Sequence, residues 1–160
     1  MFYTGVGSRK TPVSILKLMT RFAQCQYDQG YTLRSGGAKG ADQAFERGAQ
    51  GDADIFYANE ATEEAMDLAR RFHPGWDRLS DYAKRLHGRN AFQVLGPRLN
   101  EPSEFLICWT PDGCITHQSR SWNTGGTGTA ISIADKYEVP VLNLKNPSTY
   151  NQILMNMERD

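Results

Sequence analysis

Two glycine-rich segments carry the residues of this chain that are best suited to chemistry. Residues 35–42 read Ser-Gly-Gly-Ala-Lys-Gly-Ala-Asp, and residues 124–129 read Thr-Gly-Gly-Thr-Gly-Thr. Glycine tolerates positive φ and lets the backbone approach a ligand closely. A helix that begins at such a turn directs unpaired N–H groups and the positive end of its dipole at an anion. Two such turns in one small chain predict a site for a phosphorylated nucleotide.

Charged and hydroxyl side chains beside these turns could hold the phosphate. A guanidinium such as that of Arg9 or Arg34 grips phosphate through two hydrogen bonds, and the ammonium of Lys39 acts as a point charge. Ordinary surface charge and simple helix capping are the alternatives for these residues and for the threonines. We expect the ligand to contact Gly7, Ser8, Arg9, Arg34, Ser35, Gly36, Gly37, Lys39, Asp42, Arg89, Asn90, Trp109, Gly125, Gly126, Thr127, Gly128 and Thr129.

Three carboxylates are candidates for acid–base chemistry. Asp42 and Glu46 are four residues apart, so they share one face of a helix, and Asp42 could accept a hydrogen bond from a ribose. Glu60 follows an expected strand and could activate water. Each also has a purely structural explanation, because an acid in the first turn of a helix stabilises it by about 0.3–1 kcal/mol.

The segment from His87 to Gln93 could form a pocket that recognises a base. Within it, Phe92 would stack on the base, Asn90 and Gln93 would bond its polar edge, and Arg89 would hold a phosphate. The alternative is an amphipathic helix with Phe92 in the core.

Composition and spacing exclude several other classes of site. The three cysteines form no C-x-x-C pair, and the histidines lack partners at metal-ligand spacing, so we expect no metal and no required cofactor besides the nucleotide. No segment has the roughly 20 apolar residues of a membrane span, and the start of the chain lacks a secretory pattern. We therefore expect a cytoplasmic protein, in the host cytoplasm if it is phage-encoded. The 18 basic and 18 acidic residues give a net charge of +0, so any binding to nucleic acid must be local.

Strand-like and helix-like patterns alternate along the whole chain. Strands are expected at 2–7, 31–34, 54–58, 104–109 and 139–144, and helices at 12–29, 41–50, 61–72, 79–95, 128–137 and from 147 onwards. In the first helix, Thr11 is expected as N-cap and Pro12 at the first helical position. This order predicts one domain, residues 1–160, with an α/β fold: a Rossmann-like, doubly wound, mostly parallel sheet with helices on both faces. The glycine turns then meet at the carboxyl edge of the sheet, where such folds bind ligands.

Two common nucleotide motifs are incomplete in this chain. Residues 5–10 read Gly-Val-Gly-Ser-Arg-Lys and lack the last glycine of the dinucleotide fingerprint, and Arg34 and Ser35 stand where an acid would hold the ribose. The P-loop is absent because Lys39 precedes the last glycine and no hydroxyl follows it. A dehydrogenase and a Walker-type NTPase are therefore disfavoured.

The motifs together resemble the SLOG superfamily, which joins the DNA-processing protein DprA (Smf) to the Lonely-guy (LOG) nucleotide phosphoribohydrolases. Residues 35–42 are similar to the S-G-x-A-x-G-x-D of DprA, and residues 125–129 to the P-G-G-x-G-T-x-x-E of LOG enzymes. With Gly7, Ser8 and Arg9 after the first strand, the resemblance extends from residue 1 to about residue 144. It implies a nucleotide ligand, a homo-oligomer such as a dimer, and a small stand-alone member of phage or bacterial type.

The departures from the family pattern leave three functions open. Ser132 stands where LOG enzymes have a catalytic glutamate, and Thr124 replaces the proline. The chain could bind a phosphorylated or NAD-derived nucleotide as a sensor or sequestering protein. It could be a LOG-like phosphoribohydrolase that cleaves the N-glycosidic bond with another carboxylate, from Asp42, Glu46 or Glu60. It could also be a DprA-like recombination accessory that binds single-stranded DNA, which the short chain and neutral charge disfavour.

Overall fold

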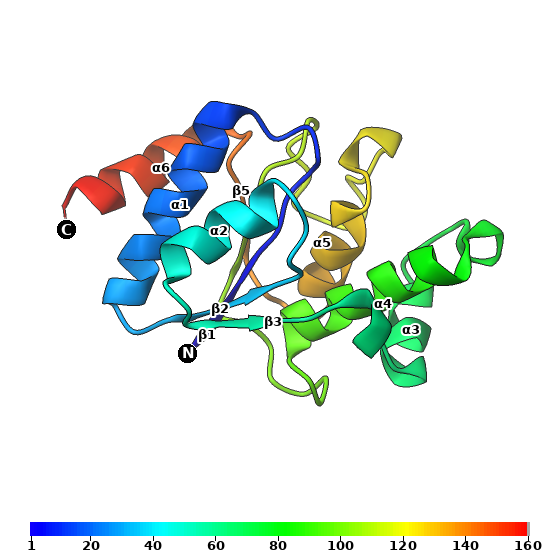
Figure 1. Ribbon diagram of the computed structural model, residues 1–160. Helices are drawn as coiled ribbons and strands as arrows, with labels where there is room; N and C mark the ends of the chain where they lie inside the picture. Colours follow the sequence, from blue (N-terminus) through cyan, green and yellow to red (C-terminus); the bar gives the residue numbers. More distant parts are fainter. Residues whose placement is uncertain (160) are drawn as a thin grey trace.

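The computed structural model describes residues 1–159, and all five of its strands join one parallel sheet (Figure 1). The strand order is β3-β2-β1-β4-β5. The strands are β1 (Phe2–Gly5), β2 (Thr32–Ser35), β3 (Ala53–Ile55), β4 (Leu106–Cys108) and β5 (Val141–Asn143). Each is short, and all pairs are parallel because a helical crossover connects each strand to the next. The predicted α/β fold with a parallel sheet is confirmed.

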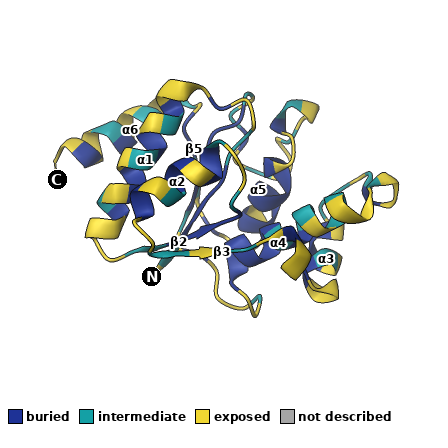
Figure 2. Ribbon diagram, viewed as in Figure 1, coloured by how far each residue is buried: buried dark blue, intermediate teal, exposed yellow. Residues whose placement is uncertain are grey.

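Helices cover both faces of the sheet, and each helical layer has its own apolar cluster. One face carries α1 (Val13–Asp28), α2 (Ala41–Ala49) and α6 (Pro147–Glu158). The other carries α3 (Glu63–Arg70), α4 (Asp81–Leu95) and α5 (Thr127–Lys136). Figure 2 shows the buried sides of these helices turned toward the sheet and toward one another. The chain is therefore doubly wound, as its alternating pattern predicts.

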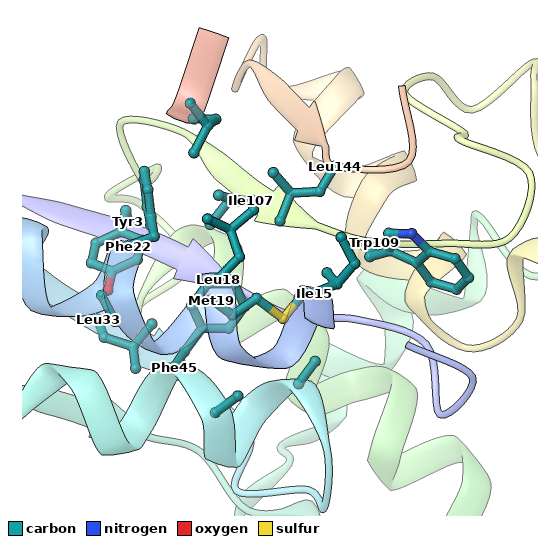
Figure 3. Packing of buried hydrophobic residues seen from close by; sticks show 14 of the residues in the cluster. Tyr3, Ile15, Leu18, Met19, Phe22, Leu33, Phe45, Ile107, Trp109 and Leu144 are labelled. Atoms are coloured by element: carbon teal, nitrogen blue, oxygen red, sulfur yellow. The ribbon is translucent and has the colours of Figure 1, made fainter. Parts of the chain in front are cut away.

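The cluster under α1 and α2 is densely packed (Figure 3). Met19, Leu33, Phe45 and Ile107 are completely buried there. Burying one such side chain stabilises a fold by about 1.5–3 kcal/mol. Gly48 lets α1 and α2 pack closely, because a Cβ at this position would overlap the carbonyl oxygen of Thr20.

The starts of α1, α3, α4 and α5 differ from the prediction by one or two residues. Pro12 is the N-cap of α1 and not its first residue, because the hydroxyl of Thr11 donates to the carbonyl of Ser8 (2.6 Å) inside the preceding turn instead of capping the helix. The third helix begins after Thr62, whose Oγ1 accepts from the amide of Ala65, and a short 3-10 helix at Ala58–Glu60 precedes it. The third strand also ends earlier than predicted, at Ile55 instead of Ala58, so a 3-10 helix stands where its end and the following turn were expected.

The direction of winding reverses between β1 and β4, which are neighbours in the sheet although far apart in sequence. The loops that follow these two strands diverge, and in open α/β sheets this switch point is where ligands bind. No helix within residues 1–159 has both the length and the apolar character needed to cross a membrane.

Candidate functional site

A cleft of about 790 Å³ opens at the carboxyl edge of the sheet, at the switch point between β1 and β4. Segments that follow β1, β2 and β3 line it, together with one side of α4 and the turn before α5. Its volume falls within the range of small-molecule sites, roughly 300–1,000 Å³. Both glycine turns reach it, as predicted from the sequence.

The first glycine turn is already occupied by carboxylates of its own chain. Oε2 of Glu46 accepts hydrogen bonds from the hydroxyl of Ser35 (2.5 Å) and the amide of Gly37 (3.0 Å). Oδ2 of Asp42 accepts from the amide of Ala38 (3.2 Å). These two acids satisfy donors of the turn that precedes α2, and Asp42, in the first turn of α2, also complements the helix dipole. A phosphate at this turn would have to displace them.

The second glycine turn is open. The first turn of α5 contains no acidic residue, and no side chain caps the helix at Gly126. Among residues 1–159, no acceptor bonds the amides of Gly125, Gly126 or Thr127, and the first amide of the segment that does find one is that of Gly128. A Cβ at Gly125 or Gly126 would meet nothing within 4 Å, so packing does not explain these glycines. This is a free helix N-terminus facing a cleft.

A hydrogen-bond network around the exposed Asp112 holds this second turn in place. The carboxylate of Asp112 accepts from the hydroxyls of Thr110 (2.8 Å), Ser121 (2.8 Å) and Thr124, and from the amide of Cys114 (3.3 Å). Burial opposes ionisation of Asp112, but the bonds from Thr124, Ser121 and Thr110 outweigh it and lower the pKa. Asp112 therefore fixes the start of the turn from outside the cleft.

The cleft concentrates positive charge in a neutral chain. Its lining includes Arg9, Lys10, Lys39 and Arg89, whereas Asp42 is the one acidic residue among the described lining residues. Low-dielectric walls focus such a local field. The cleft therefore favours an anion although the molecule as a whole carries no net charge.

Asp42 and Arg89 converge on Gly36. A Cβ at Gly36 would lie 2.9 Å from both Cζ of Arg89 and Oδ2 of Asp42, and Nη1 of Arg89 donates to the carbonyl of Gly36 (3.0 Å). Burial raises the pKa of Asp42 to about 6, against the lowering effects of the Ala38 amide and the Arg89 charge. A carboxyl group with this pKa can give or take a proton near neutral pH.

One side of α4 forms a wall of the cleft from mouth to floor. Tyr82, Leu86, Asn90 and Gln93 recur at helical spacing along it, and all of them line the cleft. Exposure falls along this row, from 65% for Tyr82 to 8% for Asn90 and 1% for Gln93. Nδ2 of Asn90 also donates to the carbonyl of Gly126 (3.4 Å), which links α4 to the second glycine turn.

Three exposed aromatic side chains stand in the lining of the cleft: Tyr57, Tyr82 and Trp122. Trp122 is 86% exposed. A flat ligand that stacks on such a ring removes apolar surface from water, which stabilises the complex. The cleft therefore offers stacking surfaces in addition to charge.

Most of the residues predicted from the sequence meet in this cleft. Those that line it are Gly7, Ser8, Arg9, Gly36, Gly37, Lys39, Asp42, Arg89, Asn90, Gly125, Gly126 and Thr127. Those that do not are Arg34, Ser35, Glu46, Glu60, Trp109, Gly128 and Thr129.

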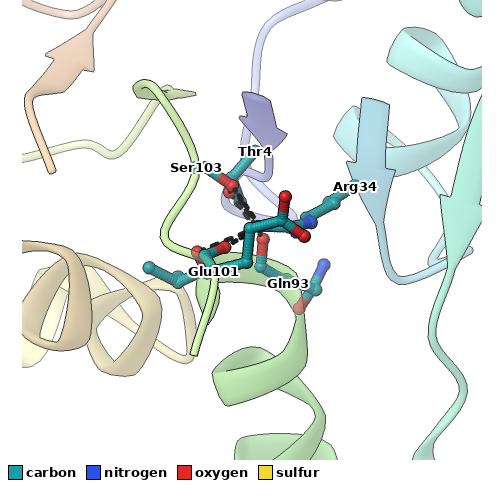
Figure 4. A network of polar contacts seen from close by, with 6 residues as sticks. Thr4, Arg34, Gln93, Glu101 and Ser103 are labelled. Atoms are coloured by element: carbon teal, nitrogen blue, oxygen red, sulfur yellow. Dashed lines mark hydrogen bonds and ion pairs between the residues drawn. The ribbon is translucent and has the colours of Figure 1, made fainter. Parts of the chain in front are cut away.

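Arg34 is the clearest correction (Figure 4). Its guanidinium is completely buried, donates to the carbonyl of Glu101 (2.6 Å) and the hydroxyl of Ser103 (3.1 Å), and stacks 4.1 Å from the ring centre of Phe2. Side chains alternate across a strand, so Arg34 points away from the face that Leu33 covers. It joins β2 to the segment after α4 and does not contact the cleft.

Trp109, Gly128 and Thr129 also have structural roles. The side chain of Trp109 packs with the apolar cluster on the α1 side. Its backbone carbonyl accepts a hydrogen bond from the amide of Ser8 (3.0 Å), in the segment after β1 that lines the cleft. A Cβ at Gly128 would collide with the guanidinium of Arg120. Oγ1 of Thr129 pairs with Nδ1 of His87 (2.8 Å). Trp109 therefore supports the segment after β1, whereas Gly128 and Thr129 hold α5 against Arg120 and His87.

Neither Glu46 nor Glu60 reaches the cleft. Glu46 closes the first glycine turn, as described above, and Oε1 of Glu60 accepts from the amide of Tyr57 (2.9 Å) at the start of the 3-10 helix. Of the three carboxylates considered, only Asp42 lines the cleft.

Ser132 does not line the cleft either. α5 turns Thr127 and Ala130 toward the cleft, and Ser132 lies about 200° around the helix from Ala130. Its Oγ is bonded by Nδ1 of His117 (2.7 Å) and Nη1 of Arg120 (3.0 Å). In this structure a carboxylate at position 132 would therefore face the half-buried Arg120 and not the cleft.

His87 is neutral at physiological pH. Burial lowers its pKa to about 4, and the charges of His73, Arg120 and Arg89 act in the same direction. Its ring lies 4.6 Å from that of His73. No group of three or more metal-ligating side chains occurs in the part of the chain that the structure describes.

Several residues of the candidate site were not predicted from the sequence. They are Tyr57, Tyr82, Leu86, Asn123 and the organising Asp112. Tyr82 and Leu86 precede Asn90 at helical spacing, and this signal could have identified both as residues of the cleft. No pattern in the sequence around Asp112 indicates its role.

Comparison with known proteins gives no neighbour. No protein-family model matches the chain, no curated protein matches it, and no solved structure matches it. The geometry of the cleft must therefore carry any conclusion about function.

Proposed function

We propose that the cleft binds a phosphorylated or NAD-derived nucleotide, and that the chain is a sensor or sequestering protein of SLOG type. The observation that carries the proposal is the open N-terminus of α5, which lacks a side-chain cap and an acid in its first turn and faces a positively charged cleft. The resemblance of residues 35–42 and 125–129 to SLOG motifs supports the same ligand.

The phosphate belongs at the second glycine turn. There the amides of Gly125, Gly126 and Thr127 have no other acceptor among the described residues, and the helix dipole favours an anion. At the first turn, the carboxylates of Asp42 and Glu46 would repel it. This asymmetry gives the ligand one orientation, with Asp42 and Arg89 on the opposite wall.

Calorimetric titration of nucleoside 5′-monophosphates against the matching nucleosides tests the proposal. Charge-assisted hydrogen bonds contribute about 1.5–3 kcal/mol each, so the phosphate should increase affinity by a factor of about 100 or more. Equal affinity for nucleosides and nucleotides would refute the assignment of the second turn.

A second candidate is the phosphoribohydrolase activity, and one observation favours it. The carboxyl group of Asp42 has a raised pKa of about 6 and lies beside the guanidinium of Arg89 inside the cleft. It could therefore serve as the base that activates water against the N-glycosidic bond. Chromatography after incubation with nucleoside monophosphates tests this: released base that disappears in Asp42→Asn supports hydrolysis, and intact nucleotide supports binding alone.

The expected homo-oligomer and the DNA-binding alternative stay predictions. A native mass spectrum gives the oligomeric state. Single-strand binding through Tyr57, Tyr82 and Trp122 should appear as a salt-sensitive gel shift, and no shift at low salt would remove that alternative.

A further inference from the structure

Gln93 has a buried side chain whose polar atoms have no partner. The residue is 1% exposed and lines the cleft, yet neither Nε2 nor Oε1 of its carboxamide forms a hydrogen bond within the described chain. Its backbone carbonyl, by contrast, accepts from the hydroxyls of Thr4 (2.6 Å) and Ser103 (3.4 Å). Figure 4 shows the carboxamide extending away from that network. A buried amide without hydrogen-bond partners lowers the stability of the fold, so its presence indicates a role in binding a ligand.

The carboxamide lies at the inner end of the cleft. It follows Tyr82 by about three turns of α4, or about 16 Å, along the row whose exposure falls steadily. The apolar side chains of Val6 and Ala130 also line the cleft. Apolar walls with a few placed polar groups are typical of the part of a site that holds a flat organic ring.

The hydrogen-bonding atoms of the Gln93 carboxamide restrict which ligand groups can pair with it. A carboxamide presents a donor and an acceptor side by side in one plane. A phosphate offers acceptors only, so it would pair with Nε2 and be repelled by Oε1. The edge of a nucleobase offers an adjacent donor and acceptor in one plane, and glutamine pairs with such edges through two hydrogen bonds.

We infer that Gln93 is the residue that reads the base: its carboxamide forms a paired hydrogen bond with the edge of the nucleobase at the floor of the cleft. This inference rests on the proposed nucleotide function. It places the base beside Gln93 and leaves the phosphate at the turn of Gly125 and Gly126, to which Asn90 on the same helix is already bonded.

The test compares Gln93→Met with the wild-type chain, using nucleoside 5′-monophosphates and ribose 5-phosphate as ligands in calorimetric titrations. Methionine keeps the length of the side chain and removes both polar atoms. We expect affinity for the nucleotide to fall about 10- to 100-fold while affinity for ribose 5-phosphate is unchanged. Without ligand, the variant should unfold at a temperature equal to or above that of the wild type, because the unpaired amide is gone. Gln24→Met, at an exposed position of α1, is the matched control and should change neither value.

Three results would overturn the inference. They are unchanged nucleotide affinity in Gln93→Met, an equal loss for nucleotide and ribose 5-phosphate, and a lower unfolding temperature in the free variant, which would show that the amide already has a partner. If Gln93→Met does not fold, Gln93→Leu, whose side chain also lacks polar atoms, takes its place in the same titrations. Failure of the wild type to bind either ligand would instead refute the proposed nucleotide site itself, and the inference with it.

Discussion

Replacing Asp42 with asparagine should stabilise the free protein at neutral pH and lose this advantage in acid. Asp42 is 6% exposed, and burial raises its pKa from an ordinary 3.8 to about 6. Each pKa unit corresponds to 1.36 kcal/mol, so keeping the carboxylate ionised in the fold costs about 3 kcal/mol. Asparagine has a similar shape, keeps an oxygen that can accept from the Ala38 amide, and carries no charge.

The sign of the effect follows from proton binding. Between about pH 4 and pH 6 the folded state holds a proton on Asp42 that the unfolded state has released, so the contribution of Asp42 to the free energy of unfolding falls as pH rises. Urea unfolding of both proteins from pH 4 to pH 7.5 isolates this group, because the other titrations cancel in the difference. The advantage of Asp42→Asn should grow by about 2 kcal/mol across this range, because part of the total of about 3 kcal/mol is already present at pH 4. A difference that is independent of pH, or that grows toward acid, would refute the reasoning.

Three other perturbations probe the surroundings of the cleft. Arg34→Met should lower the free energy of unfolding by about 3 kcal/mol, because the carbonyl of Glu101 loses a buried donor, while the nucleotide dissociation constant of the folded variant stays unchanged; urea titration and calorimetry measure both. Asp112→Asn puts amide donors against the hydroxyls of Ser121 and Thr124, so nucleotide affinity should fall about tenfold by calorimetry, and unchanged affinity would mean that the turn is held by other contacts. The pKa of His87 is about 4, below its ordinary 6.5, so the contribution of His87 to the free energy of unfolding should decline between pH 6.5 and pH 4, opposite to that of Asp42, because the unfolded state takes up the proton first. The free energy of unfolding of the wild type minus that of His87→Gln, which does not titrate, should therefore fall toward acid in the same unfolding series, and a difference that is independent of pH would contradict this.

The fold could be predicted from the sequence because its signals are local. Alternating strand-like and helix-like patterns gave all five strands and six long helices, with errors confined to their ends. One such error, at Pro12, arose because the Thr11 hydroxyl has a nearby acceptor in the carbonyl of Ser8, which no rule about single helices would reveal.

The site was only partly predictable, because side-chain direction depends on tertiary structure. Both glycine turns were identified, but the sequence cannot show that Asp42 and Glu46 fold back onto the first and leave the second open. Arg34 was misplaced because strand alternation turns it toward the segment after α4. The strongest new residue, Gln93, stood within a segment proposed to read a base, but its burial without a partner is visible only in the folded chain.

Nucleotide binding to Gly126→Val tests the central claim most directly. Gly126 has φ −63°, and a Cβ there would meet nothing within 4 Å, so valine fits the free fold and covers the amides of the second turn. Calorimetry with a nucleoside 5′-monophosphate should show that Gly126→Val reduces affinity by more than about 100-fold and that Gly126→Ala reduces it by less. The unfolding midpoint of Gly126→Val should stay close to that of the wild type. A folded Gly126→Val that binds the nucleotide as tightly as the wild type would contradict the account, because the phosphate would then lie elsewhere.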